Sequence, residues 1–68
     1  MINIIFGNPE GFDTKTYTLD EAFLVLTSLN NKEKDLYVDH QAFEIIKLTK
    51  NIIEDASHII VQDKMVGA

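Results

Sequence analysis

The chain has 68 residues, 46% of them hydrophobic, and a net charge of -5 from 11 acidic residues and 6 lysines, with no arginine and no cysteine. A chain of this length has room for one core, so we expect residues 1–68 to form a single small globular domain. The absence of cysteine excludes disulfides, thiolate metal sites and thiol catalysis. The acidic balance without arginine disfavours nucleic-acid binding, which requires several phosphates to be neutralised at once.

The sequence carries no run of about 18 apolar residues such as a membrane span requires. Met1 leads directly into strand-like residues, without the basic segment or the cleavage site of a signal peptide. We therefore expect a cytoplasmic protein that does not contact a membrane. Many Ile, Asn and Lys residues, with no Arg, Cys or Trp, are typical of an A+T-rich coding sequence and favour a bacterial or phage source.

The first part of the sequence predicts a β-hairpin. Residues 2–6 are rich in isoleucine and partly alternate, which predicts a first strand that ends at Gly7. Residues 8–11, Asn-Pro-Glu-Gly, fit a type I turn. The β-branched and aromatic residues 14–18 predict the returning strand.

A helix is expected next. Residues 18–21, Thr-Leu-Asp-Glu, match a capping box, in which the threonine and the glutamate satisfy the first free amides of a helix. Asn30 and Asn31 predict its end, because asparagine tolerates the left-handed conformation. Apolar residues between these two signals recur at spacings of three and four and form one stripe: Leu19, Ala22, Phe23, Leu26 and Leu29.

After a polar connection over residues 32–35, residues 36–38 predict a short strand. Asp39 is then expected to cap a second helix that ends at Ser57 or His58. The expected stripe of that helix comprises Ala42, Ile45, Ile46, Thr49, Ile52, Ile53 and Ala56.

The last predicted element is a strand over residues 58–62, with a continuation through Met65 and Val66 left open. Residues 50–62 fit a helix or a strand, because pairs of isoleucines suit either period. The predicted order is thus β-β-α-β-α-β. It favours an α/β (α+β) fold, a small two-layer sandwich with the hairpin and both helices packed on a mixed sheet, with the strand order undetermined. Four residues are expected to be buried: Phe23, Leu26, Ile46 and Ile53.

Candidate chemistry is confined to the two histidines. His40 precedes Glu44 by four residues, and on one helix face this pair is half of a metal site. Because no further ligands follow at a suitable spacing, we interpret the pair as a solvated first turn. His58 follows two acids, but the adjacent Ser57 points away from it on a strand, so a histidine at a helix C-terminus is the simpler interpretation.

We therefore assign no catalytic residue, no metal ligand and no cofactor, and expect a protein that is not an enzyme. One alternative is a small-ligand or metal-binding protein, or a minimal enzyme, that uses His40 with Glu44 or uses His58. Nucleic-acid binding is a further alternative, disfavoured by the charge.

The strands themselves suggest a different function, because they are apolar on both sides. Ile5 lies opposite Ile4, and Ile60 lies opposite Ile59, yet two helices of this length do not cover both faces of a sheet. The sequence therefore favours a small regulator, adaptor or inhibitor that binds a second copy of itself, another protein, or both. The expected contact residues are Ile5, Phe12, Phe43, Ile60 and Val66.

Overall fold

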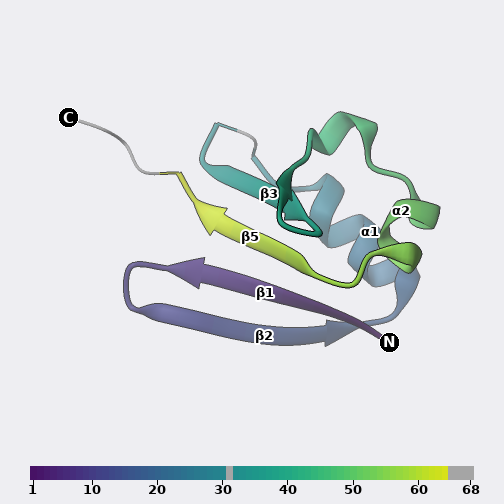
Figure 1. Cartoon of the computed structure of the whole chain (residues 1–68), viewed down its shortest axis with the longest axis horizontal. Coiled ribbons are helices and arrows are strands. Elements are labelled where there is room, and N and C mark those ends of the chain that lie inside the picture. The colour runs from purple at the N-terminus through teal and green to yellow at the C-terminus, as the bar shows by residue number, and fades with distance from the viewer. Residues whose placement is uncertain (31, 65–68) are drawn as a thin grey trace.

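The structure is a computed structural model that describes residues 1–30 and 32–64. It is a small α+β domain with a five-strand mixed sheet and two helices (Figure 1). The elements follow in the order β1 (Ile2–Asn8), β2 (Gly11–Tyr17), α1 (Leu19–Thr27), β3 (Lys34–Val38), β4 (Gln41–Ala42), the 3-10 helix η1 (Ile45–Lys47), α2 (Lys50–Asp55) and β5 (Ile59–Asp63).

The strands lie in the order β2-β1-β5-β3-β4. The central pair, β1 and β5, is parallel, and the other three pairs are antiparallel. Figure 1 shows the helices close together near the end of the sheet where β2 ends and β5 begins, whereas the turn between β1 and β2 lies at the opposite end. The strand order, which the sequence left open, places β1 and β5 side by side although they are far apart in the sequence.

The N-terminal hairpin is confirmed, but both of its strands are longer than predicted. β1 does not end at Gly7 but continues to Asn8. The ring of Phe12 on the paired strand lies over Gly7 and occupies the space that a side chain at this position would need. A Cβ atom built at Gly7 would lie 3.0 Å from that ring. In the turn, the Asn8 side-chain oxygen accepts a hydrogen bond from the backbone amide of Glu10 at 2.9 Å, and Gly11 has a φ of 140° that favours glycine.

The capping box of α1 is confirmed. The Glu21 amide donates to the Thr18 hydroxyl at 3.2 Å, and the Thr18 amide donates to the Glu21 carboxylate at 3.0 Å. The hydrogen bond from the Thr18 amide to the Glu21 carboxylate, with a smaller contribution from the Thr18 side chain, lowers the pKa of Glu21. The helix ends at Thr27, earlier than predicted, where the hydroxyls of Thr27 and Ser28 bond back to carbonyl groups of the preceding turn. The second half of the predicted stop signal, Asn31, lies outside the described residues.

Replacing the cap residue by alanine should weaken the fold measurably. Thr18→Ala removes the acceptor for the Glu21 amide, and we expect a loss of about 1 kcal/mol, within the ~0.5–2 kcal/mol typical of such caps. In a domain of this size the thermal midpoint should fall by several degrees. Thr18→Ser is the matched control, because it keeps the hydroxyl and should retain most of the stability. Identical melting curves for the alanine and parent proteins would contradict the role of this cap.

The helix predicted to begin at Asp39 is wrong. Asp39 and His40 have positive φ values of 51° and 69° and form the two-residue turn between β3 and β4. Two positive φ angles define the turn that best matches the twist of a hairpin, and aspartate and histidine tolerate this region better than most residues. The expected stripe is therefore divided between β4, η1 and α2, and residues 50–62 contain a short helix followed by a strand.

The α2 helix begins later than the sequence suggested. Thr49 serves as its cap, since its hydroxyl accepts from the Ile52 amide at 3.3 Å. β5 then covers most of the predicted last strand, whereas its suggested continuation through Met65 and Val66 lies outside the described residues.

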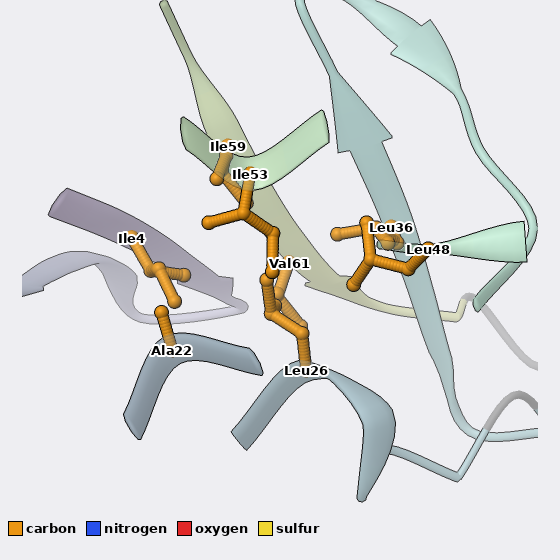
Figure 2. Close-up of a cluster of buried hydrophobic side chains, with 8 residues drawn as sticks. All are labelled: Ile4, Ala22, Leu26, Leu36, Leu48, Ile53, Ile59 and Val61. Carbon is orange, nitrogen blue, oxygen red and sulfur yellow. The ribbon is translucent and has the colours of Figure 1, made fainter. Parts of the chain in front are cut away.

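The core joins one side of the sheet to the helices, as Figure 2 shows. In that view Ala22 points toward Ile4, and Leu26 of α1 lies close to Val61 of β5. The buried residues are Ile4, Ala22, Leu26, Leu36, Leu48, Ile53, Ile59 and Val61.

Two of the four residues predicted to be buried, Leu26 and Ile53, are confirmed, and Phe23 is half-buried against the core. Ile46 was predicted wrongly, since it is 90% exposed. It lies in η1 rather than on a helix stripe, and the neighbouring Ile45 packs against the core in its place.

Candidate functional site

One side of the sheet carries side chains that take no part in the core. Side chains alternate across a strand, and the strand pairing aligns the alternate positions of neighbouring strands. We call the side that points away from the buried cluster the open face. Its residues are Asn3, Ile5, Gly7, Phe12, Thr14, Thr16, Asp35, Tyr37, Ala42, Ile60 and Gln62.

The centre of the open face is an apolar row that crosses the sheet. The register pairs Ile5 of β1 with Ile60 of β5, and Ile60 in turn with Tyr37 of β3. Thr14 of β2 and Ala42 of β4 continue the row to the two edges. The two isoleucines and the tyrosine are half-buried by their neighbours on the sheet, and none of them packs against the core. An apolar row on a side without helical cover is a surface suited to a partner.

Polar side chains flank this row on the N-terminal side of β1. There the Thr16 hydroxyl donates to the side-chain oxygen of Asn3 at 2.8 Å, across the β1–β2 pair. The hydrogen bond between Thr16 and Asn3 lies within one chain, so it remains in place when a partner covers the neighbouring apolar row.

At the other end of the open face, Phe12 extends the apolar surface toward the hairpin turn. Its side chain is 69% exposed and lies over Gly7, as expected for an aromatic ring beside a strand glycine. A pocket in this region is lined by Gly7, Asn8, Pro9, Phe12, Gln62, Asp63 and Lys64. The ring is thus held by its own strand pair while one side stays accessible.

The structure brings together three of the five expected contact residues. Ile5, Phe12 and Ile60 all lie on the open face. Phe43, also expected to contact a partner, packs against the core instead, and Val66 lies outside the described residues. Tyr37 was not among the contact residues predicted from the sequence, although the alternation of Leu36, Tyr37 and Val38 places its side chain opposite the buried Leu36.

The two histidines meet, although not in the pairing that the sequence suggested. His40 and Glu44 do not share a helix, because His40 lies in the β3–β4 turn. The ring of His40 instead lies beside that of His58, with centroids 5.0 Å apart and planes tilted by 42°. Within residues 1–30 and 32–64, no group of three or more His, Cys, Asp or Glu side chains is arranged to hold a metal ion.

Asp39 holds the two histidine segments together. Its amide donates to the His58 carbonyl at 2.9 Å, while its carboxylate accepts from the amides of Ser57 at 2.8 Å and His58 at 2.9 Å. The hydrogen bonds from the His58 and Ser57 amides lower the pKa of Asp39. The residue predicted to cap a helix therefore joins the turn after β3 to the start of β5.

Ion pairs lie at one end of the sheet and between the two helices. Lys34 pairs with Asp63 between β3 and β5, and Lys64 lies 3.7 Å from Asp35 at the same end of the sheet. Between the helices, the Lys50 ammonium lies 2.7 Å from the Asp20 carboxylate and lowers the pKa of that group. Exposed pairs of this kind contribute little to stability, typically below about 1 kcal/mol each.

Neither α1 nor α2, the α-helices of the described residues, is long and apolar enough to cross a membrane. Comparison of the chain with protein-family models, with curated proteins and with solved structures finds no match.

Proposed function

We propose that this chain is a small, cytoplasmic, non-enzymatic protein-interaction module that self-associates through the open face of its sheet. The observation that carries the proposal is the apolar row of Ile5, Ile60 and Tyr37, which lies on the side of the sheet away from the helices and the core. Burial of apolar surface contributes about 25 cal/mol per Å² to association, before the loss of rotational and translational freedom is subtracted.

The low charge of the open face is compatible with a second copy as the occupant. Two copies of net charge -5 repel each other, and this repulsion is smallest when they meet through a surface with few charges. Among the strand residues assigned above to the open face, Asp35 is the only charged one, and Lys64, which lines the pocket beside Phe12, lies 3.7 Å from it. On β2, by contrast, the charged residues Asp13 and Lys15 occupy the opposite side of the strand. Depletion of charge is typical of the centre of a protein interface.

The arrangement of the row also suits a two-fold axis. In a symmetric dimer each residue of one copy meets the corresponding patch on the other, so the patch must be complementary to itself. The row meets this condition in its two isoleucines and its alanine, which have no donor or acceptor that needs an opposite partner. The hydroxyls of Tyr37 and Thr14 both donate and accept, so each can bond to a like group on a second copy. Phe12, at the margin of the open face, adds exposed aromatic area to the same side.

Sedimentation velocity over a range of concentrations tests the proposal. The parent chain should sediment as a dimer at high concentration and dissociate on dilution. Ile60→Asp places a charge in the centre of the row and should weaken dimerisation by at least about 30-fold, as expected for a contact worth ~2 kcal/mol. Leu24→Asp is the matched control, since Leu24 is a 67% exposed apolar residue of α1 and is not part of the open face. Circular dichroism establishes that both variants remain folded.

Three outcomes separate the alternatives. Dissociation by Ile60→Asp but not by Leu24→Asp supports the open face as the interface. Dissociation by Leu24→Asp alone would assign the contact to the helices and contradict the proposed surface. A parent chain that sediments as a monomer at every concentration would overturn self-association and leave a different protein as the only partner class for this face.

A further inference from the structure

The histidine pair is a separate feature from the open face and has no part in the proposed self-association. His40 and His58 are exposed, belong to different segments, and place their rings 5.0 Å apart. We propose that the two imidazoles together form a binding site for one late first-row divalent ion, of which Zn²⁺, Ni²⁺ and Cu²⁺ are the representatives. Imidazole nitrogen is a preferred ligand for all three ions.

The spacing of the rings matches chelation by both side chains of one chain. With a metal–nitrogen distance of about 2.0–2.1 Å, the centroid of a coordinating imidazole lies ~3.2 Å from the metal. Two such rings at a ligand–metal–ligand angle between roughly 90° and 110° have centroids about 4.5–5.2 Å apart. The observed separation of 5.0 Å falls within that interval. The ring planes are tilted by 42°, so the two rings are not stacked face to face.

The backbone that carries the rings is held in place by Asp39. Three hydrogen bonds of 2.8–2.9 Å join this residue to Ser57 and His58, so the turn that carries His40 is tied to the segment that carries His58. Ligands that are already close before an ion arrives lose less conformational freedom on binding. The Asp39 carboxylate and the net charge of -5 also favour the approach of a cation.

The ligand set determines which ions the site accepts. No third His, Cys, Asp or Glu of the described residues joins the pair, so the remaining coordination positions are left to water or to an external ligand. A closed structural zinc site takes four protein ligands, so the ion here should exchange with solvent. Mg²⁺ and Ca²⁺ prefer oxygen ligands and should not bind, whereas Cu²⁺ should bind more tightly than Ni²⁺ or Zn²⁺.

Calorimetric titration of the whole chain with Ni²⁺ and with Zn²⁺ at neutral pH tests the site. We expect one ion for each chain, and a rise of several degrees in the thermal midpoint at saturating ion, because an ion that binds the folded chain stabilises it. Mg²⁺ at the same concentration is the control and should shift nothing. The titration is repeated with Ile60→Asp, which leaves both histidines in place and keeps this result independent of self-association.

The decisive variants remove one imidazole at a time. His40→Asn keeps a residue that tolerates the positive φ of the turn, and His58→Gln keeps a polar side chain of similar reach. Each should weaken binding at least about tenfold, since loss of even an outer partner of a metal ligand costs 10–100-fold. The double variant should lose little more than either single variant, because chelation ends when the first ligand is removed.

Other results would overturn the site. Two ions per chain, or single variants that each keep half of the binding, would show that the histidines act independently. Unchanged affinity in both single variants would place the ion elsewhere. Binding that occurs only when two chains are joined, seen as ion-induced sedimentation of Ile60→Asp as a dimer, would replace the intramolecular chelate by a bridge between copies.

Discussion

Leu26→Ala should lower the free energy of unfolding by about 2–5 kcal/mol, as is typical when a leucine in a packed core is truncated. Leu26 is fully buried and lies beside Val61 in the cluster that joins α1 to the sheet (Figure 2). A domain of 68 residues has a total stability of about 3–10 kcal/mol. The variant should therefore lose a large fraction of the total stability, and urea denaturation followed by circular dichroism measures the change.

The matched control for this variant lies two residues away on the same helix. Leu24 is 67% exposed, so Leu24→Ala makes the same chemical change without opening a cavity and should alter stability by no more than about 0.5 kcal/mol. Equal losses for the two variants would mean that the exposed side of α1 is itself covered, and would contradict the orientation of the helix described above.

Ile53→Ala is expected to have an effect of similar size, about 2–5 kcal/mol, because Ile53 is 1% exposed and is the residue through which α2 enters the core. Loss of its side chain leaves a cavity between α2 and the sheet. Since α2 has only six residues, it depends on this contact more than on its own hydrogen bonds. The expected result is a fall of the thermal midpoint by many degrees, measured by calorimetry.

Ile46→Ala is the control that separates the observed fold from the helix suggested by the sequence. On a continuous helical stripe, Ile46 and Ile53 lie on one face and both truncations are costly. In the structure Ile46 is 90% exposed, so its truncation should change stability by less than about 0.5 kcal/mol. A loss as large as that for Ile53→Ala would support the longer helix.

The first half of the fold was predictable because its signals are local. The turn at residues 8–11 and the capping box at residues 18–21 each depend on side chains that bond to backbone groups two or three residues away. Such interactions do not require knowledge of the rest of the chain. Only the ends of the elements were misplaced. Gly7 continues β1 because Phe12 covers it from the neighbouring strand, and this contact is not visible in a local window.

The second half was not predictable in the same way, because the same residues satisfy two patterns. Asp39 is an acceptable helix cap and an acceptable turn residue, and the isoleucines that follow it fit a helical stripe. The choice depends on partners distant in sequence. In the structure Asp39 bonds to Ser57 and His58, which are 18 and 19 residues away. Those contacts stabilise a turn with positive φ and leave only a short α2.

The same distinction between local signals and long-range contacts applies to the two candidate sites. The sequence by itself determined that the first and last strands are apolar on both sides, because alternation along a strand is a property of the chain. Only the tertiary structure decided that Ile5, Ile60 and Tyr37 form one row, since this requires β1 to pair with β5 and β5 with β3. The tertiary structure alone also decided that His40 lies beside His58. Strand pairing brings together turns and strand ends that are far apart in the sequence, and no local periodicity encodes that proximity.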